Sequence, residues 1–368
     1  MKNNTFWRKL KHPSKGGQAI LALAPMAGIT DSAFRQMCKK YGADVVYSEM
    51  ASVSALFYKP QKTLKMLQFN AKDRPYVVQL FGNKPEHFAE ATKIITKKIR
   101  PDGIDINFGC PARKVFGQGS GCALMPQKKL AREIISSVCE NTHLPVSIKI
   151  RAGLHPIKYP QNGLSASGEQ FNGVKNITAI KFIENIKDLP FSAVMVHGRT
   201  YEGKFSGKVD FEIVQNLKKI IPDKIVLANG GINTPEEAKK ILEDYPTLDG
   251  LGIARGSLGR PFIFDEIKSL TKCHPERIRL LAEKPKDLTR LDSSTTLGMT
   301  SKYNFSKIKG VALEHSKLVW KEGGKLGMLE MRKHLSWYVR GFPNASELRQ
   351  KLVQIKTLEE IKNILKNS

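Results

Sequence analysis

Short apolar, β-branched runs alternate with longer stretches of helical periodicity through the first 270 residues of the chain. Most of these runs are too apolar for strands with one solvated face, which favours parallel strands covered by helices. We predict eight strands, at residues 20–24, 44–48, 76–80, 103–107, 146–150, 193–197, 225–229 and 249–254. Helices are predicted near residues 31–41, 85–99, 126–140, 176–187, 210–221 and 234–244, with another beginning at Pro261.

Eight strand–helix units in succession predict an α/β fold, a (β/α)8 TIM barrel over residues 20–270. An open doubly wound sheet is the alternative, but no Gly-x-Gly-x-x-Gly motif follows the first strand. At the last full helix, Thr234, Pro235 and Glu237 have the spacing of a capping box with proline at the first helical position.

The other segments differ in composition from the barrel. Residues 1–19 form a basic N-terminal extension, and residues 152–175, rich in Gly, Ser and Asn, are expected to be an insertion above the barrel. Residues 271–312 have little periodicity and are interpreted as a linker or insertion. Apolar residues return at helical spacing in residues 313–368, which predicts a small all-helical C-terminal domain.

The strong positive charge of the chain indicates a polyanionic partner, which the barrel pattern alone does not. The chain has 60 Lys and Arg against 34 Asp and Glu, a formal net charge of +26. Such an excess attracts nucleic acid first and anionic membranes second. A lysine-rich proteome alone would also produce it. Residues 271–368 hold 20 basic and 10 acidic side chains, so we expect a polyanion to contact this tail.

Several classes of protein are excluded. No stretch approaches the ~18 consecutive apolar residues of a membrane-spanning helix, so we expect no membrane partner. Residues 1–18 lack the apolar core of a secretory signal. The five cysteines include no Cys-x-x-Cys pair, so we expect no disulfide framework, no metal site and a reducing, cytoplasmic location. No feature of the sequence indicates a protein partner.

Polar side chains follow nearly every predicted strand, and barrel enzymes place their chemistry at that rim. We therefore predict a site there from the residues that end the strands: Pro25, Met26 and Ala27; Ser48 and Glu49; Gln79; Asn107 and Cys110; Lys149 and Arg151; His197 and Arg199; Asn229, Gly230 and Gly231; Ala254 and Arg255.

The last two strands indicate a phosphate-bearing cofactor. Asn229-Gly230-Gly231 and Ala254-Arg255 are small-residue turns that expose backbone N–H groups, and Arg255 adds a charge. Lys149 ends an otherwise apolar strand, where a cation stabilises negative charge on a reduced flavin ring. Gln79 has the donors and acceptor for the pyrimidine edge of a flavin, and His197 could bridge flavin and substrate, although a lone histidine is more often structural.

Cys110 lies on a Gly–Pro turn after the fourth strand, close to two cations. A thiol in that setting can act as an acid or a nucleophile. Cys122 is the rival thiol, but it begins a helix-like stretch. For Cys38 and Cys139, at helical positions, the reading as a small buried apolar residue is favoured.

Taken in order, these segments resemble the signatures of the tRNA-dihydrouridine synthase family. They are distributed over residues 23–349 and read LAPMAGITDSAFR, SEM, QLFG, IDINFGCPARKV, VSIKIRAG, MVHGRT, ANGGI, ARGSLGRPFIF and KHLSWYVRGFPNASELR. Single short motifs of this kind are weak, but the ordered set is specific.

The resemblance implies an FMN-containing barrel followed by a helical domain that helps to hold tRNA. It implies NADPH as reductant and reduction of the C5–C6 double bond of particular uridines. Cys110 matches the general acid; Asn107, Arg151 and Arg199 are assigned to the substrate. The residues assigned to FMN are Pro25, Met26, Ala27, Gln79, Lys149, His197, Asn229, Gly230, Gly231, Ala254 and Arg255. Gly231 and Ala254 depart from the residues usual in the family.

Two other functions stay open at this point. An FMN barrel acting on a small pyrimidine such as dihydroorotate would explain the barrel but would leave the basic tail without a role. A catalytically inactive RNA-binding relative would explain the charge, but Cys110, Lys149 and His197 argue against it.

Overall fold

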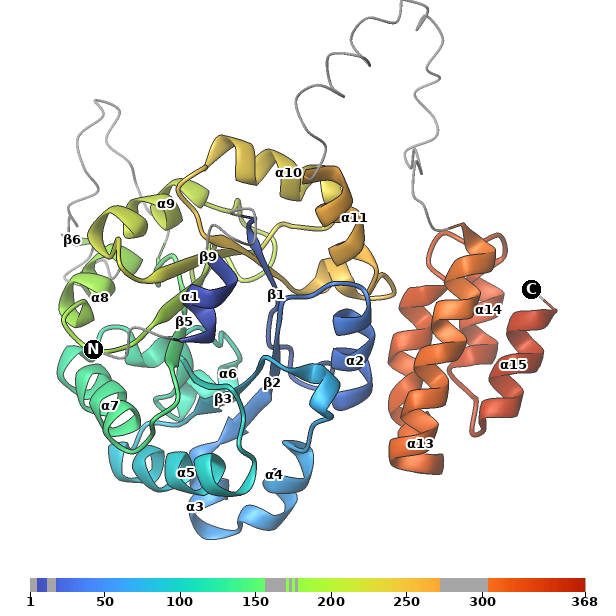
Figure 1. Ribbon diagram of the computed structural model, residues 1–368, viewed down its shortest axis with the longest axis horizontal. Coiled ribbons are helices and arrows are strands. Elements are labelled where there is room, and N and C mark those ends of the chain that lie inside the picture. Colours follow the sequence, from blue (N-terminus) through green and yellow to red (C-terminus); the bar gives the residue numbers. More distant parts are fainter. Residues whose placement is uncertain are drawn as a thin grey trace, which may run out of the picture.

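A closed barrel of parallel strands, ringed by helices, forms the larger part of the protein (Figure 1). The computed structural model describes residues 5–11, 18–155, 170–171, 174–175, 178–271 and 304–367. The strands neighbour one another in the order β1-β10-β9-β8-β5-β4-β3-β2, and β1 closes the ring with both β10 and β2. Their bounds are Ile20–Leu23 (β1), Val45–Ser52 (β2), Tyr76–Phe81 (β3), Gly103–Asn107 (β4), Val146–Arg151 (β5), Ala193–His197 (β8), Ile225–Asn229 (β9) and Gly250–Ile253 (β10).

These strands confirm the predicted barrel, and each coincides with one predicted apolar run. The clearest difference is in β2, which runs four residues beyond the predicted end at Ser48, to Ser52. Its pairing with β3 shifts register between Tyr47 and Met50. Ser48 lies at this irregularity, where its hydroxyl accepts a hydrogen bond from the Gln79 N–H at 2.9 Å. The bulge therefore turns Met50 toward the site, where the sequence had suggested Ser48 and Glu49.

Helices follow the strands as the periodicity predicts. They are α2 (Ser32–Lys40), α5 (Pro85–Lys98), α7 (Lys128–Glu140), α8 (Ala179–Ile186), α9 (Phe211–Ile220), α10 (Pro235–Asp244) and α11 (Ile263–Thr271). The capping box of α10 is present, with the Glu237 N–H donating to Thr234 Oγ1 at 3.2 Å. Shorter helices that the sequence did not indicate are α3 (Val53–Tyr58), α4 (Pro60–Met66) and α6 (Arg113–Gly117).

The N-terminal extension contributes to the core as well as to the charge. Residues Phe6–Lys11 form helix α1, which lies across the middle of the barrel in Figure 1. Trp7 on this helix is buried in a cluster that includes residues at the starts of the strands, among them Ile20, Val45 and Val77. Its indole therefore closes the amino-terminal end of the barrel, opposite the predicted site. The sequence did not predict this role, because the basic residues around Trp7 led to its assignment to a basic extension.

A helical domain packs against the barrel at α2. It consists of α13 (Phe305–Tyr338), α14 (Ala345–Leu352) and α15 (Leu358–Lys366). Helix α13 begins at Phe305, capped by Asn304, so the end of the segment interpreted as a linker is helical. It turns back on itself at Gly324, whose φ is +53°. One apolar cluster joins this domain to Ala33 and Met37 of α2 and to Phe262.

The two predicted insertions lie largely outside the described residues. Of the first, Gln170–Phe171 (β6) and Val174–Lys175 (β7) form a short antiparallel pair. Of the second, residues 272–303 are outside the description. Among the helices that are described, none combines the length and the apolar character needed to cross a bilayer.

Candidate active site

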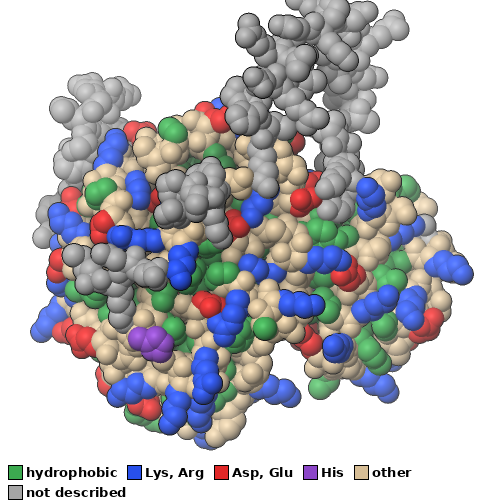
Figure 2. Space-filling model, in the orientation of Figure 1, with side chains coloured by type: hydrophobic (Ala, Val, Ile, Leu, Met, Phe, Trp, Pro, Cys, Tyr) green, Lys and Arg blue, Asp and Glu red, His purple; other side chains and the backbone are tan. Residues whose placement is uncertain are grey.

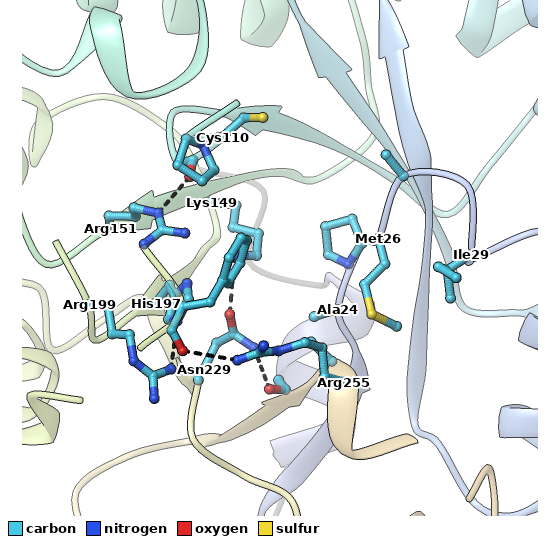
Figure 3. Close-up of a pocket in the computed structure, with 18 of the residues that line it drawn as sticks. Ala24, Met26, Ile29, Cys110, Lys149, Arg151, His197, Arg199, Asn229 and Arg255 are labelled. Carbon is cyan, nitrogen blue, oxygen red and sulfur yellow. Dashed lines mark hydrogen bonds between the residues drawn. The ribbon is translucent and has the colours of Figure 1, made fainter. Parts of the chain in front are cut away.

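A cavity of about 580 Å³ opens at the carboxyl ends of the barrel strands (Figure 3). Of the residues predicted at the rim, Ser48 and Glu49 do not line it. The others do: Pro25, Met26, Ala27, Gln79, Asn107, Cys110, Lys149, Arg151, His197, Arg199, Asn229, Gly230, Gly231, Ala254 and Arg255. Strands far apart in the chain deliver these residues to one place because all of them run in the same direction around the ring. Cys110 and Arg255 lie at opposite ends of the group drawn in Figure 3.

Two close-packed turns after β9 and β10 form one wall. Gly230 and Gly231 have φ of +100° and +69°, and a Cβ at Gly230 would lie 2.3 Å from His197 Cδ2. A Cβ at Gly256 would lie 2.2 Å from the carbonyl oxygen of Ile232, so the two turns press on each other. Ala254 lines the same wall, and its small side chain adds little bulk there. A ligand can therefore approach the backbone closely at this wall.

Lys149 projects into the cavity from β5 and is held there by Asn229. Its Nζ donates to Asn229 Oδ1 at 3.2 Å, and Asn229 Nδ2 donates to the carbonyl of Gly252 at 2.6 Å. Burial and the nearby Arg151 guanidinium together lower the pKa of Lys149 to about 8, against the opposing effect of Asp105. A cation is thus present near neutral pH without a carboxylate directly paired to it.

A chain of hydrogen bonds fixes the amide of Gln79. Its Nε2 donates to Asp105 Oδ2 at 2.7 Å, and its Oε1 accepts from Asn107 Nδ2 at 2.9 Å. Asp105 also accepts from Ser147 Oγ at 2.6 Å. Burial raises the pKa of Asp105 to about 6, although these donors and Lys149 oppose the rise. The sequence reasoning missed Asp105, whose signal was an acid inside the apolar run Ile-Asp-Ile.

Cys110 is placed by the backbone around it. Asn107 Oδ1 accepts hydrogen bonds from the N–H groups of Gly109, at 3.0 Å, and Cys110, at 2.9 Å. Gly121 packs behind it, where a Cβ would come within 2.9 Å of the Cys110 carbonyl oxygen. Asn107 therefore acts on both Gln79 and the cysteine turn.

The other described cysteines do not line the cavity. Cys122 is fully buried, and burial raises the pKa of its thiol to about 12. Cys38 is buried as well, as its helical position predicted, and Cys139 is partly buried on α7. None of the four described cysteines forms a disulfide. Cys110 is thus the cysteine whose side chain a bound substrate can meet.

The basic residues of the cavity differ in their hydrogen bonds and in their charge. Arg151 is buried and donates to the carbonyls of Gly109, Thr200 and Lys204, at 2.8–3.0 Å, so it braces two loops. Burial, together with Lys149 and the arginines around it, lowers the pKa of His197 to about 2. His197 is therefore a neutral imidazole at physiological pH, and Arg199 Nη1 lies 3.4 Å from its Nε2.

Two aromatic residues of the cavity were missed from the sequence. Trp337 reaches the cavity from α13 in the helical domain and is 36% exposed. Phe205, in the loop after β8, is half exposed, with the guanidinium carbons of Arg151 and Arg255 at 5.4 and 5.0 Å from its ring centre. Trp337 stands in the segment KHLSWYVRG that carried the family resemblance, but nothing marked Phe205.

Comparison with known proteins gives a consistent result. A family model described as dihydrouridine synthase matches residues 22–368. The chain is 32% identical over 330 residues to tRNA-dihydrouridine synthase B of Pseudomonas aeruginosa, covering 89% of this chain and 86% of that protein. It is 32% identical to a probable tRNA-dihydrouridine synthase of Helicobacter pylori, covering 94% and 89%. Probable tRNA-dihydrouridine synthase 1 of Synechocystis is 29% identical, covering 99% and 90%.

Proposed function

Since the chain belongs to the dihydrouridine synthase family, we propose that it uses bound FMN and NADPH to reduce the C5–C6 double bond of uridines in tRNA. The observation that carries the proposal is the single cavity in which Lys149, His197 and Cys110 meet two glycine-rich turns. The reaction would take place in the cytoplasm, where tRNA is found.

The residues present suit FMN. The turns at Gly230 and Gly231 and at Ala254 and Arg255 expose backbone N–H groups and a guanidinium, which is what a ribityl phosphate requires. Lys149 supports negative charge on the ring system, and Gln79, held by Asn107, has a remaining amide proton for its pyrimidine edge. FMN, when bound, would accept hydride from NADPH and deliver it to C6 of the uracil ring.

Cys110 supplies the second half of the reduction. After hydride reaches C6, C5 must receive a proton, and the Cys110 thiol is the general acid we assign to that step. Asn107 holds the turn that presents the thiol. Arg199 and Arg151 belong to the substrate side of the cavity, where Arg199 contacts the uracil and Arg151 acts by holding the surrounding loops.

The helical domain and the charge suit a tRNA partner. Figure 2 shows Lys and Arg side chains over both the barrel and the helical domain on the α1 side of the molecule, the end of the barrel away from the cavity, so the basic charge is not confined to one face. The formal net charge of +26 favours contacts with the phosphates of a polyanion. Such contacts to phosphates bind without reading sequence and weaken steeply with salt. Trp337 at the cavity mouth offers a flat ring to a base that has left its stack.

The direct test starts from purified full-length protein and tRNA from a strain that lacks dihydrouridine synthases. We expect a yellow protein whose released flavin is FMN, and NADPH-dependent dihydrouridine in the tRNA by mass spectrometry. Mapping the modified positions would identify the target uridines. A colourless protein that binds tRNA would instead favour the inactive RNA-binding relative. Turnover of free dihydroorotate or uracil without RNA would favour the small-pyrimidine oxidoreductase.

FMN binding to the flavin-free protein should weaken as the pH rises through 8. Burial lowers the pKa of Lys149 to about 8, so its positive charge is present below that pH and is lost above it. If only the protonated form binds FMN well, the Kd rises by up to about tenfold between pH 8 and pH 9. Fluorescence titration of FMN from pH 6.5 to 9 measures this. His197 and Asp105 have pKa values near 2 and 6, so they titrate below the informative part of the range.

Lys149→Arg is the matched control, because a guanidinium keeps its charge over this pH range. Its Kd for FMN should stay level between pH 7 and pH 9. A wild-type Kd that is equally level would show that the proton on Lys149 does not contribute to FMN binding.

Replacement of Trp337 by alanine should impair tRNA binding and leave the flavin in place. Stacking of a base on an aromatic ring contributes about 1–3 kcal/mol, so the KM for tRNA should rise roughly five- to hundredfold. Steady-state kinetics with tRNA, together with the flavin content, measure the effect. Leu326→Ala is the control, since Leu326 is 76% exposed in the same helix and does not line the cavity. Equal effects of both variants would refute a stacking role.

A further inference from the structure

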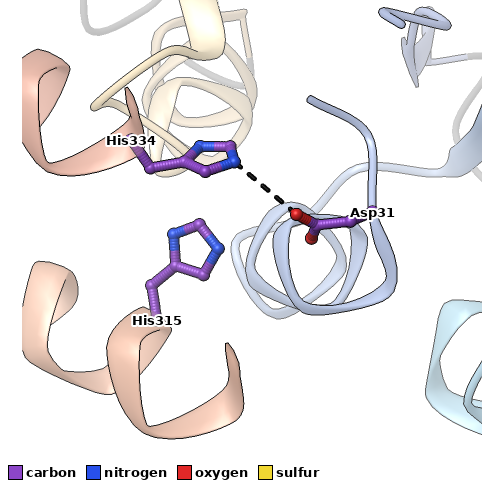
Figure 4. A group of neighbouring side chains, drawn as sticks. All are labelled: Asp31, His315 and His334. Atoms are coloured by element: carbon purple, nitrogen blue, oxygen red, sulfur yellow. Dashed lines mark ion pairs between the residues drawn. The ribbon is translucent and has the colours of Figure 1, made fainter. Parts of the chain in front are cut away.

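A second group of reactive side chains lies outside the cavity, where the helical domain meets the barrel. It consists of Asp31, His315 and His334, and one ligand atom from each lies within 4.8 Å of the others (Figure 4). His315 and His334 are 0% and 1% exposed, whereas the Asp31 side chain is 33% exposed. The proposed reaction uses none of these residues.

Three of the four ring nitrogens of these histidines have no hydrogen-bond partner within the described part of the chain. His315 Nε2 and both nitrogens of His334 are buried and make no hydrogen bond. His334 Nε2 is 3.7 Å from Asp31 Oδ2, which is too far for a hydrogen bond. Buried polar atoms are nearly always paired, so the unpaired Nε2 atoms of His315 and His334 beside the Asp31 carboxylate indicate a missing ligand; His334 Nδ1 lies on the other side of its ring and is not part of this set.

We propose that Asp31, His315 and His334 bind a zinc ion that fastens the helical domain to the barrel. Two imidazoles and a carboxylate are a donor set that zinc accepts, with a water as fourth ligand through the exposed edge of Asp31. Zinc bonds of about 2.0–2.2 Å place tetrahedral ligands roughly 3.4 Å apart. The His334–Asp31 separation is already close to that value.

The surroundings hold each ligand in the form that a metal requires. His315 Nδ1 lies 3.2 Å from the Tyr338 hydroxyl, which leaves Nε2 directed at the cluster. Such a second partner commonly orients a metal-bound histidine. Asp31 Oδ1 accepts the Phe34 N–H at 2.8 Å as the cap of α2, so Oδ2 is left for the ion.

The three residues come from three separate segments. Asp31 begins α2 on the barrel, and His315 and His334 stand on the two arms of α13 that meet at Gly324. An ion here would tie both arms to the barrel. Trp337 follows His334 by less than one helical turn, so the same ion would steady the aromatic residue at the cavity mouth. Sequence reasoning missed this set, because the expectation of no metal site rested on the cysteines alone.

The test is metal analysis of full-length protein after dialysis against zinc and then against metal-free buffer. We expect about one tightly held zinc per chain, lost in His315→Ala and in His334→Ala. His143→Ala is the matched control, since His143 is exposed and away from the cluster, and it should keep the ion. Cobalt in place of zinc should give absorption beyond 550 nm, outside the flavin bands.

A stability measurement covers the case in which a variant fails to fold. The melting temperature of the wild-type protein should rise by several degrees with zinc and fall with chelator, because an ion that binds only the folded state stabilises it. Zinc content no higher in wild type than in the two cluster variants, or a melting temperature that does not respond to zinc, would overturn the proposal. Either outcome would mean that the space between the three side chains holds an ordered water, or that only the weak His334–Asp31 ion pair links them. Neither readout depends on dihydrouridine synthesis.

Discussion

Cys110→Ala should abolish dihydrouridine formation and leave the flavin and its reduction by NADPH intact. The thiol lines the cavity, and its turn is fixed by the Asn107 side chain and by close packing of Gly121. A positioned general acid accelerates a reaction by about 10²–10⁴-fold, so the rate of product formation should fall by that factor. Single-turnover assays with pre-reduced enzyme and tRNA, read by mass spectrometry, isolate this step from flavin reduction.

Cys122→Ala provides the comparison. Cys122 is buried behind the cavity wall, where burial raises the pKa of its thiol to about 12, so it is poorly suited to exchange protons with a substrate. This variant should lose some stability and keep most of its activity. A result in which Cys122→Ala is inactive and Cys110→Ala is active would show that the assigned thiol is the wrong one.

Gly230→Ala should nearly eliminate FMN binding. Gly230 has φ of +100°, and a methyl group there would lie 2.3 Å from His197 Cδ2 and 2.6 Å from its Nε2. Strain in this backbone region costs about 1–2 kcal/mol, and overpacking adds about 1–3 kcal/mol. Because about 1.4 kcal/mol corresponds to a tenfold change, the Kd for FMN should rise roughly hundredfold or more. The flavin content of the purified protein and titration of the apoprotein measure this.

Gly310→Ala separates this effect from a general intolerance of added methyl groups. Gly310 lies in α13 with no atom within 4 Å of an added Cβ, so alanine there should leave FMN binding unchanged and favour the helix slightly. If Gly230→Ala retains wild-type flavin affinity, the turn after β9 does not form the cofactor wall that we assign to it.

Local pattern determined the barrel and the position of its chemistry. Eight apolar runs separated by helical periodicity leave little choice but parallel strands covered by helices, and parallel strands all end at one rim. The polar residues after the runs were therefore expected at that rim, and Cys110, Lys149 and His197 line the cavity there. Ser48 and Glu49 were misplaced for the same reason, because a bulge in β2 cannot be read from alternation.

Contacts between distant segments were decided only by the tertiary structure. No helical or strand periodicity around Trp7 predicts that it closes the barrel. It is buried because α1 packs against the barrel strands. Trp337 reaches the cavity, and His315 and His334 meet Asp31, because α13 reverses at Gly324 and packs on α2. Periodicity records which face of an element is apolar but not which other element covers that face. Burial likewise sets the pKa values of Lys149 and Asp105, since desolvation depends on all the atoms around a group and not on its neighbours in the chain.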